Sequence, residues 1–124
     1  MIDIKIGDCR EVLKTLPDKH FQTCVTSPPY YGLRDYGTDA QIGLEKTPEQ
    51  FVESLVNVFR EVKRVLKDDG TLWLNLGDSY SSGGRTTTTN QTVRGNTDYG
   101  VTRPPPIVGI KPKDLIGIPW RVAF

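Results

Sequence analysis

The sequence predicts an α/β domain with three mainly parallel strands. Three short apolar segments, residues 2–6, 21–27 and 71–77, are separated by segments with helical spacing. Strands that alternate with helices in this way are typical of parallel α/β sheets. The chain has 124 residues, of which 36% are hydrophobic and 25% charged, as in an ordinary globular domain.

The first strand and helix are predicted at the N-terminus. Three isoleucines alternate with polar residues in segment 2–6, and this alternation predicts a strand with one buried face. A short helix is expected next in DCREVLKTL, because Asp8 and Glu11 have the spacing of a capping box.

The following elements are the most clearly marked. FQTCVTS, residues 21–27, is rich in aromatic and β-branched residues and predicts the second strand. The longest helix is expected to begin at Pro48, with Thr47 as its N-cap and Gln50 completing a capping box. It ends before a DDG turn, and TLWLNLG, residues 71–77, forms the third strand.

Charge and cysteine content limit the classes of protein to consider. The net charge is +1, so a nucleic-acid surface would have to be local. Cys9 and Cys24 lie in or beside apolar segments, and we expect buried free thiols of a reducing cytoplasm rather than a disulfide. The sequence has no signal peptide and no apolar run near the ~20 residues of a membrane span. We therefore expect a cytoplasmic protein with no membrane partner.

The second half of the chain contains a long irregular connection. Residues 79–113 are full of Ser, Thr, Gly, Asn and Pro and have no periodic segment. Such a connection is too long for an ordinary loop in a compact domain. It is either flexible or a DNA-facing loop that becomes ordered on binding. The apolar stretch after it predicts the start of a helix near Pro119 and ends without a polar cap, which indicates the N-terminal part of a longer protein.

Polar or aromatic residues follow all three expected strands. GDC follows the first, SPPYYG the second and GDSY the third. Ligands of open α/β sheets gather outside the carboxyl ends of the strands. The three ends therefore predict a single site.

Each residue of the SPPY corner contributes to the binding of one kind of ligand. Pro28 and Pro29 fix the backbone, so that the Pro28 carbonyl points in one direction, beside the hydroxyl of Ser27. Tyr30 offers a flat face. Two acceptors and an aromatic ring suit a planar ring with an exocyclic amino group, such as a base flipped out of DNA.

TSPPYYGLRDYG resembles the catalytic loop, (D/N/S)PP(Y/F), of the amino-methyltransferases that modify exocyclic nitrogens in DNA. IGDCREVLKTLPD, GTLWLNLGDSYSSGG and KPKDLIGIPWRVAF are similar to neighbouring segments of the β-type members, in the same order. In that group the catalytic loop precedes the glycine motif that binds the cofactor. The resemblance spans nearly the whole chain, and residues 85–103 are its least typical part.

This resemblance implies a function as well as a fold. The fold would be a partial Rossmann-like methyltransferase domain with S-adenosylmethionine as methyl donor, and residues 1–124 would form the N-terminal part of one catalytic domain. The implied activity is site-specific methylation of a flipped base in double-stranded DNA, with a partner restriction endonuclease as a further expectation. Ser27 before the prolines is more typical of members that act on cytosine N4, so this base is favoured over adenine N6.

The resemblance also implies roles for individual residues. The target amine would be held by Ser27 and the Pro28 carbonyl, and no metal is implied. Asp8 and Cys9 would line the adenine end of the cofactor, and Asp78 would line the same pocket. Two simpler interpretations remain open. Asp8 is also suited to be only the N-cap of its helix, and Cys9 to be only a packing residue, because no base is present to activate its thiol. The implied catalytic residues are Ser27, Pro28, Pro29 and Tyr30.

One feature of the family is absent from the chain. The aromatic-x-Gly-x-Gly motif that binds the methionine end of the cofactor does not occur, and in the β order it would lie beyond Phe124. We therefore expect the isolated chain to be weak or inactive. Two alternatives are a non-catalytic truncated remnant with residual DNA or nucleotide binding, and one half of a split methyltransferase.

Overall fold

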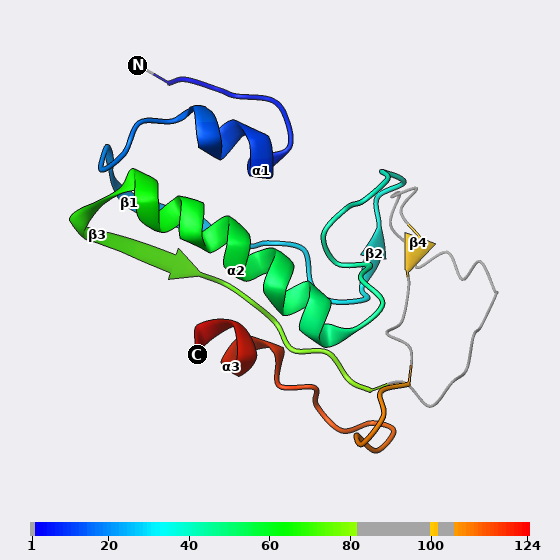
Figure 1. Ribbon diagram of the computed structural model, residues 1–124. Helices are drawn as coiled ribbons and strands as arrows, with labels where there is room; N and C mark the ends of the chain where they lie inside the picture. The colour runs from blue at the N-terminus through cyan, green and yellow to red at the C-terminus, as the bar shows by residue number, and fades with distance from the viewer. Residues whose placement is uncertain (1, 82–99, 102–105) are drawn as a thin grey trace.

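The computed structural model describes residues 2–81, 100–101 and 106–124, and it confirms the α/β class (Figure 1). The elements follow one another as α1 (Cys9–Val12), the 3-10 helix η1 (Leu13–Thr15), β1 (Phe21–Thr26), β2 (Arg34–Asp35), α2 (Pro48–Val65), β3 (Leu66–Leu74), β4 (Gly100–Val101) and α3 (Ile118–Ala123). None of the helices within these described ranges is long and apolar enough to cross a membrane.

β1 and β3 form a parallel pair that is connected through α2 (Figure 1). Thr23 lies opposite Thr71, and Thr26 opposite Leu74. The second and third expected strands are therefore confirmed, although β3 begins at Leu66 and ends three residues before the predicted position. The ladder ends here because the partner segment reaches Pro28 and Pro29, which have no amide donors, and Leu76 packs against the core.

α2 begins as the sequence predicts. The Thr47 hydroxyl accepts a hydrogen bond from the Gln50 amide at 3.2 Å, and Pro48 occupies the first turn. The apolar positions at helical spacing point inward, so one face of the helix is buried. The buried apolar side chains of this face are Phe51, Leu55, Val62 and Val65.

The N-terminal segment differs from its prediction. Residues 2–6 form no strand, and Ile2, Ile4 and Ile6 are 89%, 78% and 96% exposed. Alternation supplies an apolar face, but a strand also needs a neighbouring backbone to accept and donate its hydrogen bonds. The segment pairs with neither β1 nor β3, and the prediction of a strand here was wrong.

The cysteines are both free, and only one of them is partly buried as expected. Cys24 in β1 is half-buried, and burial raises the pKa of its thiol. Cys9 is exposed at the start of α1, so the expectation of a buried thiol there was wrong. η1 contacts the C-terminal end of α2, where the Arg64 side chain donates to the Leu13 carbonyl at 2.8 Å, whereas α1 buries no side chain.

The main core lies at the carboxyl end of the two paired strands, and not between sheet and helix along their whole length. It joins α2 to the segment after β1, to the segment after β3 and to the start of α3. The opposite sheet face is open, with Val25 77% and Trp73 65% exposed. The core residues are Tyr31, Ile42, Phe51, Leu55, Ile116 and Ile118.

The long connection predicted at 79–113 lies mostly outside the described residues. Its two ends are joined, because the Ser81 amide donates to the Asp114 carbonyl and the Ile116 amide to the Ser79 carbonyl, each at 2.9 Å. Farther along the connection, β4 pairs antiparallel with β2. The predicted helix near Pro119 is confirmed as α3.

Candidate active site

The SPPY corner begins where the sheet ends. The Asn75 amide donates to the Thr26 carbonyl at 3.0 Å, and beyond this bond the two prolines offer no amide donor to continue the ladder. The corner and the segment that follows it surround a hollow of about 250 Å³. Its lining residues are Ser27, Pro28, Pro29, Tyr30, Leu33, Arg34 and Tyr36.

Two hydrogen-bond acceptors of this corner have no donor within the part of the chain that the structure describes. Ser27 is exposed, and Pro28 is half-buried. Among residues 2–81, 100–101 and 106–124, no donor bonds to the Ser27 hydroxyl oxygen or to the Pro28 carbonyl oxygen. By contrast, the Tyr30 carbonyl accepts from the Leu33 amide at 3.4 Å. The corner therefore keeps two oxygen acceptors available to a ligand in the hollow.

Two glycines fix the position of Tyr30. A Cβ atom built on Gly77 would lie 2.7 Å from Cε2 of the Tyr30 ring, so the ring rests on the backbone that follows β3. A Cβ atom on Gly43 would lie 3.1 Å from the Tyr30 carbonyl oxygen. Gly43 also accepts from the Gly32 amide at 2.7 Å. Sequence reasoning missed both glycines, because only the close approach of the corner shows why a side chain is excluded.

The next residue, Tyr31, anchors the corner to the core. Its side chain is 1% exposed and packs against Phe51 with ring centroids 5.4 Å apart. The Ser79 hydroxyl donates to the Tyr31 carbonyl at 2.7 Å. This bond ties the carboxyl ends of β1 and β3 together, so the SPPY and GDSY segments meet in space as the sequence predicts.

Asp78 holds the start of α3. Its carboxylate accepts hydrogen bonds from three backbone amides, those of Ser79 at 2.8 Å, Gly117 at 2.9 Å and Ile118 at 2.9 Å. An anionic acceptor is favourable at this position because the first amides of a helix have no partner within it. Asp78 is therefore the N-terminal anchor of α3 and lies beside the Tyr31–Ser79 contact.

The GDC turn lies apart from the other two strand ends. Asp8 caps α1 by accepting from the Arg10 amide at 2.8 Å, while the Glu11 carboxylate pairs with Lys14 instead of completing the capping box. Hydrogen bonds from the Arg10 side chain and amide lower the pKa of Asp8 to about 2. Arg10 also donates to the Ala40 carbonyl at 3.1 Å. The turn thus contacts the loop before α2, and among the described residues no hydrogen bond joins it to SPPY or GDSY.

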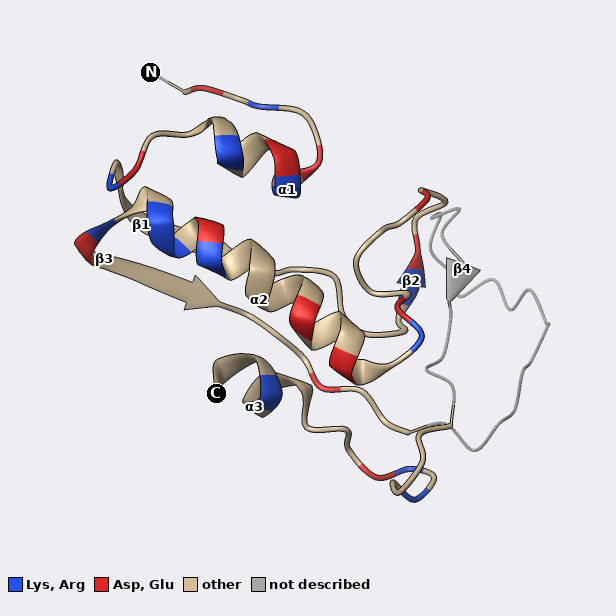
Figure 2. Cartoon of the chain, viewed as in Figure 1, with Lys and Arg blue, Asp and Glu red and all other residues tan. Residues whose placement is uncertain are grey.

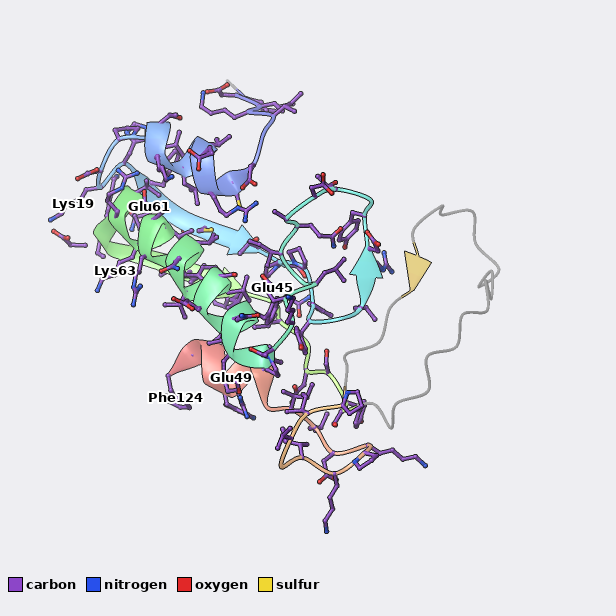
Figure 3. The ribbon with its side chains drawn as sticks, turned by 45° about the vertical axis from the view of Figure 1, so that its right-hand side comes forward. Lys19, Glu45, Glu49, Glu61, Lys63 and Phe124 are labelled. Atoms are coloured by element: carbon purple, nitrogen blue, oxygen red, sulfur yellow. The ribbon has the colours of Figure 1, made fainter. Side chains whose placement is uncertain are left out.

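A second, larger hollow lies between α2 and α3, away from the proline corner. Its volume is about 420 Å³, and two of its lining residues, Glu49 and Arg121, form an ion pair of 2.8 Å. Figure 3 shows Glu49 near the start of α2, on the side of α3. Glu49 and Glu53 line this hollow together with Arg60 and Arg121, so its charges balance and it offers no net attraction to a phosphate backbone. Its size alone does not make it the better nucleic-acid site.

Comparison with known proteins assigns the chain to a family. A family profile described as DNA methylase matches residues 21–114. The Type II methyltransferase M.SmaI of Serratia marcescens is 53% identical over 121 residues, which cover 98% of this chain and 41% of that protein. M.XycI of Xanthomonas campestris pv. cyanopsidis is 56% identical over 95% of this chain and 39% of its own length. M.Cfr9I of Citrobacter freundii is 54% identical, again over 95% of this chain and 39% of its own length.

The chain thus spans about two fifths of the length of these relatives. The matched family region contains the SPPY corner, α2, β3 and Asp78. The resemblance inferred from the sequence motifs is therefore confirmed at the level of the family. The chain belongs to the DNA methylase family.

Proposed function

We propose that this chain carries the base-binding part of a site-specific DNA amino-methyltransferase, with cytosine N4 favoured over adenine N6. The observation that carries the proposal is a pair of acceptors, Ser27 Oγ and the Pro28 carbonyl, which no described residue engages and which lie beside the Tyr30 ring in one hollow. Tyr30 would stack on a base flipped from double-stranded DNA, and such stacking contributes roughly 1–3 kcal/mol.

The two acceptors have a direct chemical purpose. An exocyclic amine is a poor nucleophile because its lone pair is delocalised into the ring. Hydrogen bonds from its two protons to Ser27 and Pro28 would favour a pyramidal nitrogen, whose lone pair can attack a methyl carbon. The nitrogen then loses one proton along its hydrogen bond to the corner, and the proton passes to solvent. No covalent bond forms between protein and base.

The methyl donor of this proposal is S-adenosylmethionine, which supplies an electrophilic methyl group and whose sulfur takes the electron pair of the broken carbon–sulfur bond. The described residues fit part of it. The Asp8 side chain remains 43% exposed despite its ion pair with Arg10, so it can still accept from hydroxyl or amino groups at the adenine end, beside the exposed Cys9. Asp78 would line the pocket through the loop that it anchors, because three amides already engage its carboxylate.

The proposal is tested by the product of methyl transfer. Duplex DNA is incubated with labelled S-adenosylmethionine and either this chain or a chimera in which it replaces the matched segment of M.SmaI. Nucleosides are then identified by mass spectrometry. We expect N4-methylcytosine from the chimera and little or none from the isolated chain. Product from neither protein would count against the function, and N6-methyladenine would correct the choice of base.

Substitutions in the chimera test the roles of the corner. Ser27→Ala should lower turnover about 100-fold, since loss of one oriented hydrogen bond to the reacting group has effects of this order. Tyr30→Ala should also weaken binding of the flipped base. Thr15→Ala is the matched control, because Thr15 also carries a hydroxyl but does not line the hollow. Unchanged turnover in both corner variants would overturn the assignment.

A further inference from the structure

Arg34 differs from the other arginines that the structure describes. Ion pairs or hydrogen bonds engage the side chains of Arg10, Arg64 and Arg121, and Arg60 donates to the Asn57 side chain at 2.8 Å. Within residues 2–81, 100–101 and 106–124, the guanidinium of Arg34 has no such partner. It is exposed and lines the hollow of the SPPY corner.

The backbone around Arg34 is held firmly. The Gln41 side chain donates to the Arg34 carbonyl at 2.9 Å and accepts from the Tyr36 amide at 2.7 Å. Arg34 also belongs to β2, which pairs with β4. The arginine therefore stands on a short segment fixed by hydrogen bonds from two directions, and not on an untethered loop.

The acidic neighbour does not neutralise this charge. Asp35, the other residue of β2 (Figure 2), turns its carboxylate toward the following turn and accepts from the Gly37 amide at 2.8 Å. No carboxylate of the described residues lies within ion-pair distance of Arg34. The hollow thus combines an aromatic face, two neutral acceptors and one cation that no described carboxylate pairs with.

We propose that Arg34 binds a phosphate next to the flipped nucleotide, an inference that rests on the proposed function. A base in the hollow carries its own backbone phosphates with it. A guanidinium can hold a phosphate with two parallel hydrogen bonds. Such a contact positions the nucleotide and carries no sequence information. Arg34 is therefore a positioning residue for DNA, whereas the amine itself is held by Ser27 and Pro28.

The test measures DNA affinity and not methyl transfer. The chain is titrated into a fluorescein-labelled duplex with one extrahelical cytosine, and anisotropy is recorded at several salt concentrations. Arg34→Gln should weaken binding about five- to tenfold at low salt and reduce the slope of log K against log salt by about 1. Arg34→Lys keeps the charge and should recover part of the affinity but not the paired hydrogen bonds. Arg60→Gln is the matched control, since Arg60 lines the other hollow, and it should change neither quantity.

A second duplex locates the contact. Neutral methylphosphonates replace the phosphates on both sides of the extrahelical cytosine. They should weaken binding of the unaltered chain but have no further effect on Arg34→Gln. Equal losses for Arg34→Gln and Arg60→Gln, or no binding by the unaltered chain, would overturn the inference. So would a change in S-adenosylmethionine affinity without a change in DNA affinity. DNA binding that depends on Arg34 without methyl transfer by the chimera would support the phosphate contact and count against the proposed function.

Discussion

The SPPY corner and the N-terminal segment 2–6 both carry clear sequence patterns, yet only the corner is fixed by its surroundings. The corner rests on Gly77, is tied to Ser79 and continues into the buried Tyr31. Segment 2–6 has three exposed isoleucines and pairs with none of the strands that the structure describes. A local pattern therefore determines structure only where the chain also supplies the contacts that complete it.

The largest effect is expected where the corner meets the core. Phe51 is fully buried and packs on Tyr31, so Phe51→Ala should lower the free energy of unfolding by about 3–5 kcal/mol, as cavities in a packed core do. Urea unfolding followed by circular dichroism measures this change. Phe124→Ala is the control, because Phe124 is fully exposed. Equal losses in both variants would contradict the position of the core.

A smaller effect is expected at the contact between Gly77 and Tyr30. Gly77 has no positive φ, so alanine is compatible with the backbone, but its Cβ would overlap the ring. Gly77→Ala should destabilise the chain by about 1–3 kcal/mol and displace Tyr30. The added cost should fall in the Tyr30→Ala background, where the ring is absent. Additive losses in the double variant would show that the ring is not the group displaced.

The effect of acid on Asp8 should be smaller still. Its pKa falls from 3.8 to about 2 on folding, so the carboxylate stabilises the fold above about pH 4 and this contribution is lost as the pH falls toward 2. Because the side chain is partly exposed, the contribution should be about 0.5 kcal/mol or less. Thermal unfolding of Asp8→Asn and of the unaltered chain between pH 2 and 5 tests it. Parallel pH profiles would contradict the ion pair with Arg10.

An equally small effect is expected at the N-terminus. Ile4 is 78% exposed, so Ile4→Ser should change the free energy of unfolding by no more than about 0.5 kcal/mol. The same urea unfolding experiment applies. A loss comparable to that of Phe51→Ala would mean that segment 2–6 is buried in solution, and the contrast between the two regions would fail.

Local signals predicted several elements well. Thr47 and Pro48 determine where α2 begins, because cap and first turn depend on neighbouring residues alone. The corner was recognisable because proline excludes a continuing strand. The roles of Gly77 and Gly43 could not be predicted, since they depend on a ring and a carbonyl brought close by the fold. Asp78 anchors α3 through amides that lie 39 and 40 positions farther along the chain, and no local sequence pattern predicts such distant contacts.

The central claim is that the SPPY corner binds the amino group of a flipped base. The most direct test is a nitrogen-15 NMR titration of the labelled chain with a duplex carrying an extrahelical cytosine, compared with the fully paired duplex. We predict that the Ser27 and Tyr30 amides shift more with the extrahelical base and that the cytosine amino protons shift with them. Shifts confined to residues around Glu49 and Arg121, with Ser27 and Tyr30 unmoved, would contradict the account.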